Sequence, residues 1–268
     1  MRLSGLMITV LWVAQTVVAQ DYTKLDLQPV IDESRNLYQI VPADDASATM
    51  KNLTVLRWAN NARGSQNGAT LIWTHKGRPE AVCCIYPWGG SMSHEFDSLS
   101  RGKIRGMREA EVVWRPAEVG LKFADIPGAA APMKTAARRK LQLSKLAREF
   151  RGTMTGWKVD DSDREELRLL PRELYRYKKG DPRIIDGALY AFVQGTDPEI
   201  LLLIEAWAEK DQSAKWQYAF ARRTSGGLEG RHKGKVVWTA KKHPPNYNPT
   251  DNHISFREPI DPSALTAD

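Results

Sequence analysis

The histidines and carboxylates with potential for chemistry gather in the first half of the chain, at His75, His94, Glu95 and Asp97. A histidine beside a carboxylate can act in acid–base catalysis or bind a metal when both side chains reach one site. His94 and Glu95 are neighbours in a predicted strand, however, where adjacent side chains point to opposite faces. We therefore keep His75, His94 and Glu95 as catalytic candidates, with an ordinary solvated strand edge as the alternative.

Known catalytic motifs are incomplete at these and other positions. The pair His94-Glu95 opens like a zinc-protease motif, but Ser98 stands where the second histidine is needed. Ser100 and Lys103 have the Ser-x-x-Lys spacing of penicillin-binding enzymes without the partner motifs of that class. The chain has no Cys-x-x-Cys and no Gly-rich dinucleotide fingerprint. The sequence thus predicts neither a cofactor nor a metal site.

The two cysteines, Cys83 and Cys84, are adjacent in the middle of a predicted strand. Their side chains should point to opposite faces of the sheet, and a disulfide between them would distort the backbone. We expect both to be small apolar core residues, because free cysteine is commonly buried. A redox pair or a metal site is the alternative.

A basic segment of the chain is a predicted amphipathic helix over 132–150. Leu143, Leu146, Ala147 and Phe150 can share one apolar stripe at helical spacing. We expect this stripe to pack on a sheet while the charges remain solvated, and polyanion binding is the alternative. The net charge of +7 also favours acidic partners. The candidate polyanion-binding residues are Arg138, Arg139, Lys140, Lys145 and Arg148.

Two stretches of the chain look like copies of each other. When the chain is shifted by 119 positions, Gly68–Trp88 falls on Gly187–Trp207 without a gap, and glycine, proline and tryptophan recur at matching places. Each stretch is predicted to form two strands around a turn. Residues that are polar in one copy only are not explained by a shared fold. In the first copy these are His75, His94, Glu95 and Asp97, set against Gln194, Trp216, Gln217 and Ala219.

The ends of the chain differ in composition from the middle. We expect residues 1–19 to be a secretory signal peptide cleaved near Ala19, since Arg2 precedes an apolar run too short to span a bilayer comfortably. A retained membrane anchor is the alternative. We expect a flexible arm over 20–52 and an irregular tail over 243–268.

The segment 53–242 is predicted to be a single β-rich domain built of two similar halves, about 53–126 and 172–238, joined by the helix and a hairpin. The fold class is α+β and predominantly antiparallel. The two β meanders should pack as a sandwich or barrel, with the helix between them in sequence and laid against them.

A longer resemblance covers about 53–238. The segments that carry it are Trp73–Ala81, His94–Phe96, Leu146–Phe150, Leu174–Tyr177, Asp186–Trp207 and Trp216–Ala219. They resemble a family of exported proteins from planctomycete-type bacteria. That family has no assigned activity, so the resemblance implies export and a bacterial origin and assigns no catalytic residue.

These observations favour an exported, non-enzymatic binding or structural module of the cell envelope. A hydrolase-type enzyme with its site near His94 and Glu95 is the first alternative, and a polyanion-binding protein that uses the basic helix is the second. An acidic polysaccharide or another envelope component is the expected partner. We expect no intracellular nucleic-acid partner and no stable membrane span once the signal is removed.

Overall fold

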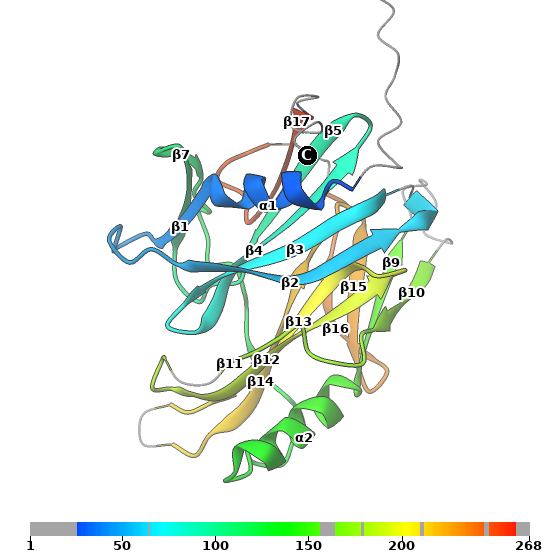
Figure 1. The fold of residues 1–268 in the computed structure, drawn as a ribbon. Coiled ribbons are helices and arrows are strands. Elements are labelled where there is room, and N and C mark those ends of the chain that lie inside the picture. The colour runs from blue at the N-terminus through cyan, green and yellow to red at the C-terminus, as the bar shows by residue number, and fades with distance from the viewer. Residues whose placement is uncertain are drawn as a thin grey trace, which may run out of the picture.

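The computed structural model describes residues 26–63, 65–155, 164–177, 180–209, 212–243 and 247–260. The predicted signal peptide lies outside the described residues. The described chain is mostly antiparallel β structure in three sheets, with two short helices, as the sequence predicts for the fold class (Figure 1). None of its helices is long and apolar enough to cross a membrane.

The first large sheet has five strands in the order β17-β5-β4-β3-β2. Its central hairpin turns through Lys76 and Gly77, both with positive φ, as expected for a tight turn at Gly77. Its strands are β2 (Lys51–Asn60), β3 (Ser65–His75), β4 (Arg78–Trp88), β5 (Ser91–Ser98) and β17 (His253–Pro259); the short 3₁₀ helix η2 (Asn61–Arg63) links β2 to β3.

The second large sheet has nine strands and curls into a half-barrel (Figure 1). Eight of them follow the order β16-β15-β9-β10-β12-β13-β14-β8, and β11 also pairs with β12. Its strands are β8 (Ala124–Asp125), β9 (Phe150–Thr155), β10 (Arg164–Leu169), β11 (Tyr175–Tyr177), β12 (Ile184–Gln194), β13 (Asp197–Trp207), β14 (Lys215–Arg222), β15 (Gly227–His232) and β16 (Lys235–Ala240).

Each large sheet buries one face against the other. Ile72 and Val82 of the first sheet share a core with Leu189, Leu201 and Leu203 of the second. This arrangement explains the uninterrupted apolar run of β13, since a strand covered on both faces has no solvated side.

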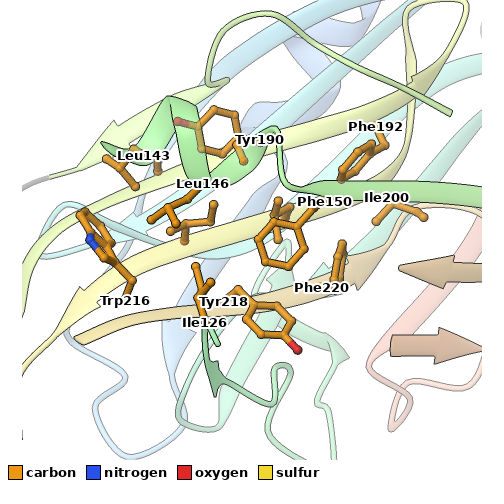
Figure 2. Packing of buried hydrophobic residues seen from close by; sticks show 14 of the residues in the cluster. Ile126, Leu143, Leu146, Phe150, Tyr190, Phe192, Ile200, Trp216, Tyr218 and Phe220 are labelled. Atoms are coloured by element: carbon orange, nitrogen blue, oxygen red, sulfur yellow. The ribbon is translucent and has the colours of Figure 1, made fainter. Parts of the chain in front are cut away.

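The helix α2 (Ala136–Ala147) covers the far face of the second sheet. Thr135 caps its first turn by accepting a hydrogen bond from the backbone N–H of Arg138. Leu143 and Leu146 contribute to a cluster with Phe150 and Trp216 (Figure 2). The helix is shorter than the predicted 132–150, because Phe150 already belongs to β9.

A small sheet and a helix cover the far face of the first sheet. The small sheet has the order β1-β6-β7, with strands β1 (Tyr38–Pro42), β6 (Ile104–Arg108) and β7 (Glu111–Trp114). The helix α1 (Gln28–Asn36) and β1 lie within the segment predicted to be a flexible arm. Leu27, Ile31 and Ile40 are fully buried there, so the apolar surface of the first sheet orders this segment.

The segment predicted to be an irregular tail also differs. Within it β17 pairs antiparallel with β5 over its whole length, and Ile254 is fully buried. Proline stands at the end of this strand, at Pro259, where a missing N–H is tolerated.

The central hairpins of the two large sheets have corresponding bounds and pairing. β3 and β4 become β12 and β13 when shifted by 119 positions, and Ala69 pairs with Ile85 as Ala188 pairs with Ile204. In each sheet a glycine lies under a ring. A Cβ atom on Gly68 would approach the ring of Trp58 to 2.4 Å, and one on Gly187 would approach the ring of Tyr177 to 2.4 Å.

The strands that follow the two hairpins, β5 and β14, correspond at a shift different from the predicted one. Ile85 pairs with His94, whereas Ile204 pairs with Tyr218. His94 therefore corresponds to Tyr218, Glu95 to Ala219 and Asp97 to Ala221, which corrects the sequence alignment of these residues. The longer connection between β13 and β14 causes the difference.

Candidate functional site

His94 lies inside the core that α1 and the small sheet cover. Its Nδ1 is 3.0 Å from the Tyr38 hydroxyl, and its ring stacks on Phe256 with 5.2 Å between centroids. Burial lowers the pKa of His94 to about 4, so the ring is neutral at pH 7. A covered, neutral imidazole of this kind packs against its neighbours and shares a hydrogen bond with Tyr38, and it is closed off from solvent.

Glu95 does not join His94, because successive side chains of β5 point to opposite faces. It lies 2.8 Å from the donating hydroxyl of Tyr86. The His75 side chain is half-buried, and its charge interaction with Asp45 helps lower the pKa of that carboxyl group. The structure therefore separates the three catalytic candidates into three environments.

The two cysteines are free and buried, as predicted. Burial raises the pKa of the Cys84 thiol to about 11 and that of Cys83 well above its usual value. The thiolate is the reactive form of cysteine, so both thiols are inert at neutral pH.

The basic helix presents fewer free charges than its sequence suggests. Arg139 is buried, its Nε donates to Asp186 Oδ2 over 2.9 Å, and it also donates to the carbonyls of Met133 and Lys134. It therefore fixes α2 to β12 and is not available to a polyanion. Lys140 lies 3.8 Å from Glu173. The remaining candidates, Arg138, Lys145 and Arg148, are exposed.

A cavity of about 840 Å³ opens where the turn between β3 and β4 meets the loop before β12. We call it the Arg78 cavity and define it by Arg78, Glu80, Ser100, Arg101 and His75 at its inner wall and by Asp44, Lys76, Lys103, Asp181 and Arg183 nearer its rim. The two loops touch at this point, since a Cβ atom on Gly180 would collide with the Lys76 carbonyl. The volume falls in the range of small-molecule sites.

One carboxylate organises the inner wall of this cavity. Glu205 of β13 is fully buried and accepts from Arg78 Nε at 2.8 Å, from Arg101 Nη2 at 2.7 Å and from the Tyr177 hydroxyl at 2.6 Å. Burial alone would raise its pKa, but the two guanidinium groups hold the pKa of Glu205 below its usual value. Glu80 Oε2 also lies 3.1 Å from Arg78 Nη1, so two carboxylates contact the two arginines.

The two arginines are held firmly in place. Arg101 lies between two rings, 3.5 Å from the centroid of Phe123 and 3.9 Å from that of Trp207. Arg78 is 5% exposed and donates to the carbonyls of Pro79 and Leu99, while its Nη2 is buried without a partner among the described residues. A buried donor with no acceptor is costly, so this nitrogen has unused binding capacity.

The opposite end of the same hairpins holds a second polar cluster, which we call the carboxylate end: Asn60, Arg63, Glu95, Asp197 and Glu199. Asn60 Nδ2 donates to Asp197 Oδ2 over 3.2 Å, and Arg63 Nη2 lies 2.9 Å from Glu199 Oε1. Burial raises the pKa of Asp197 to about 7. Burial and the nearby charge of Asp197 raise the pKa of Glu199 well above its usual value.

A buried ion network continues from this end. Arg223, 2% exposed, pairs with Asp97 and donates to the Glu95 carbonyl over 2.8 Å. Asp97 also lies 3.1 Å from His253 Nδ1. No group of three or more His, Cys, Asp or Glu residues in the described part of the chain is arranged to hold a metal ion.

Sequence reasoning missed most of these residues. Arg78 and Glu205 are 127 positions apart and Asp97 and His253 are 156 apart, so no local pattern links them. One usable signal was present in the repeat. At the shift of 119 positions Arg78 falls on Asp197, which reverses a charge between two otherwise similar turns.

Comparison with protein-family models, with curated proteins and with solved structures finds no significant match to this chain.

Proposed function

We propose that this chain is a binding protein that holds a small anionic ligand in the Arg78 cavity. The observation that carries the proposal is the fixed arginine pair in a cavity lining whose five Lys and Arg side chains outnumber its three carboxylates. Arg78 and Arg101 share Glu205, Glu80 lies 3.1 Å from Arg78, and Arg78 Nη2 has no hydrogen-bond partner among the described residues. Arginines that are already oriented lose little freedom when a ligand binds.

The rim of the cavity supports the same proposal. Among the described lining residues, Lys76 and Lys103 are exposed and form no ion pair. Cationic side chains at an opening attract anions and raise their association rate. An exported module of the cell envelope that binds acidic material, the function favoured by the sequence, is consistent with this charge.

Isothermal titration calorimetry with citrate, inorganic phosphate and D-glucuronate at low salt tests the proposal. We expect at least one of these anions to bind at 1:1 stoichiometry, with affinity that weakens as salt is added. Substituting Lys103→Ala should weaken that binding about tenfold, because a charged contact is lost. Lys235→Ala, an exposed lysine on β16, serves as the matched control and should leave it unchanged. Absence of binding by all three anions contradicts the proposal.

A second candidate is a hydrolase-type activity at the carboxylate end. The observation that favours it is the pair Asp197 and Glu199, in which burial raises both pKa values and the charge of Asp197 further raises that of Glu199. Unlike His94, Asp197 keeps part of its side chain exposed, at the start of β13. Glu95, one of the catalytic candidates from the sequence, lies close enough to influence both pKa values. His94 plays no part in this version of the enzyme hypothesis.

Release of reducing ends from a panel of neutral and uronate-containing oligosaccharides tests this second candidate. Asp197→Asn and Glu199→Gln should each abolish the release, and Glu166→Gln, a largely exposed carboxylate with 70% side-chain accessibility, should not. Equal activity in all three variants contradicts it.

We also propose that the two hairpins descend from one duplicated unit. The corresponding strand bounds, the matching pairing register and the glycine under a ring in both sheets support this. A polyanion site on α2 has less support, because Arg139 is committed to Asp186.

A further inference from the structure

We infer that the ligand of the Arg78 cavity is a sugar acid, a molecule with a single carboxylate on a ring or chain that bears several hydroxyl groups. The inference rests on the proposed anion-binding function and names its ligand class. It follows from the mixture of charges in the cavity wall, from the position of each sign, and from the absence of a purely cationic surface.

The cavity wall is not uniformly positive. Five cationic side chains line the described part of it, Lys76, Arg78, Arg101, Lys103 and Arg183, and so do three carboxylates, Asp44, Glu80 and Asp181. A phosphate or a tricarboxylate carries several negative charges close together, and the three carboxylates would repel these charges. A ligand with one negative charge meets the positive excess without that cost.

The carboxylates of the lining also restrict the chemistry of the rest of the ligand. An ionised carboxylate only accepts hydrogen bonds, so it requires a ligand rich in donors. Glu80 Oε2 lies 3.1 Å from Arg78 Nη1. Asp181 accepts from Arg183 with both carboxylate oxygens, at 2.9 Å for Oδ1 and 2.7 Å for Oδ2. Since a carboxylate has about four acceptor sites, both groups retain capacity to accept from a ligand hydroxyl.

The positive groups separate into one deep and one outer set. Arg78 is buried and Arg101 half-buried, whereas Lys76, Lys103 and Arg183 are exposed. The planar guanidinium of Arg78, a residue of the lining, suits a carboxylate, and its buried Nη2 has no hydrogen-bond partner among the described residues. The hydroxyl groups then extend toward Glu80, Asp181 and Asp44. Ser100, which is buried beside them, adds a hydroxyl of its own.

The lining also contains apolar residues. Met50 and Ile104 are buried residues of the lining, and Pro42 and Pro182 belong to it as well. A pyranose ring has an apolar face formed by its C–H groups, so a ring of this kind can contact the apolar residues, the carboxylates and the arginines together. A linear dicarboxylate satisfies the arginines alone.

Competition between chemically matched ligands tests the inference. The probes are D-glucuronate, D-glucose and inorganic phosphate, measured by calorimetry on the full chain. We expect D-glucuronate to bind at least tenfold more tightly than either D-glucose, which lacks the carboxylate, or phosphate, which lacks the hydroxyl groups. If phosphate or citrate binds and D-glucuronate does not, the sugar-acid inference is overturned while the anion-binding function stands. If no anion binds, both fail.

One substitution should change the affinities for D-glucuronate and for phosphate in opposite directions. Glu80→Gln retains the size of the side chain and removes a negative charge. It should weaken D-glucuronate binding about threefold to tenfold, because a neutral amide accepts hydroxyl groups less strongly, and it should strengthen phosphate binding by a similar factor. Opposite signs for the two probes support the inference, and a change in the same direction for both overturns it. Lys235→Ala should alter neither.

Discussion

The Arg78 cavity and the carboxylate end occupy the two ends of one pair of related hairpins, yet their charges are opposite. At the shift of 119 positions Arg78 corresponds to Asp197, Glu80 to Glu199, and Tyr86 to Glu205. At the cavity, Glu205 forms ion pairs with Arg78 and Arg101. At the other end, Glu199 has Asp197 beside it and Arg63 as its cation.

The comparison shows how one framework supports two kinds of chemistry. The strands, the register and the buried glycines agree between the hairpins, so the backbone does not dictate the difference. Two guanidinium groups lower the pKa of Glu205 at the cavity, whereas burial raises the pKa values of Asp197 and Glu199 at the other end. The Arg78 cavity has an excess of positive charge, and the carboxylate end has carboxyl groups with raised pKa values.

The largest expected effect is loss of the anchor at the cavity. Glu205→Gln removes the counter-charge that the buried Arg78 and the half-buried Arg101 share, and we expect it to reduce the free energy of unfolding by about 3–5 kcal/mol. Urea denaturation followed by circular dichroism measures the change. Glu166→Gln is the matched control on an exposed strand, expected to stay within about 0.5 kcal/mol of the wild type. Equally small losses of stability in both variants would contradict the expectation that the ion-paired Glu205 contributes more than the exposed Glu166.

The carboxylate end should instead make stability depend on pH. Because the pKa of Asp197 is raised by burial from 3.8 to about 7, its protonated form favours the folded state. The contribution is complete below about pH 4, the unfolded value, and is lost as pH rises through about 7. Unfolding free energies at pH 5, 7 and 9 should fall across this range. Asp197→Asn should flatten the profile and stabilise the protein at pH 9 by about 2 kcal/mol. A profile unchanged by the substitution would contradict the raised pKa.

The shared framework predicts equal responses at matched glycines. Gly68→Ala and Gly187→Ala each place a methyl group against a ring, so each should cost about 1–3 kcal/mol. Thermal unfolding of the two variants provides the measurement. Gly102→Ala, where the nearest side-chain atom lies 3.8 Å from the added Cβ, is the control and should be nearly neutral in stability. A cost at one glycine only would weaken the proposed duplication.

The smallest expected effects come from two tyrosine hydroxyls that donate to carboxylates at opposite ends. Tyr177→Phe removes a 2.6 Å hydrogen bond to Glu205, and Tyr86→Phe removes a 2.8 Å one to Glu95. Each should cost about 1–2 kcal/mol. We expect the loss at Tyr177 to be larger, since Glu205 is fully buried. Chemical denaturation at pH 7 compares the unfolding free energies of the two variants. A larger loss for Tyr86→Phe would contradict the expectation that burial of the acceptor carboxylate increases the cost.

Several elements were predictable because their pattern is local. The hairpin around Gly77, the apolar run of β13 and the stripe of α2 all follow from spacing, and the repeat placed β3 and β4 on β12 and β13. The helix α1 and the strand β17 were not predictable in this way. Their few apolar residues, among them Ile31 and Ile254, stabilise these elements only by packing in a core formed with distant parts of the chain.

The candidate site was predictable only in outline. His75 does line the Arg78 cavity, but its importance in the sequence came from its being a histidine. The arginines and Glu205 belong to pairs more than 100 positions apart, and their meaning depends on how the two sheets pack. Asp97 was noticed as a polar exception in its copy, and its partners, Arg223 and His253, come from segments on which sequence periodicity gave no information.

The position of β17 sets an order of events during synthesis. This strand closes the first sheet at β5, although nearly the whole chain separates it from α1 on the same sheet. Until residues 253–259 have left the ribosome, β5 has an unpaired edge and the first sheet is incomplete. Completion of this sheet must therefore wait for the synthesis of β17, and until then the edge of β5 can be engaged by chaperones.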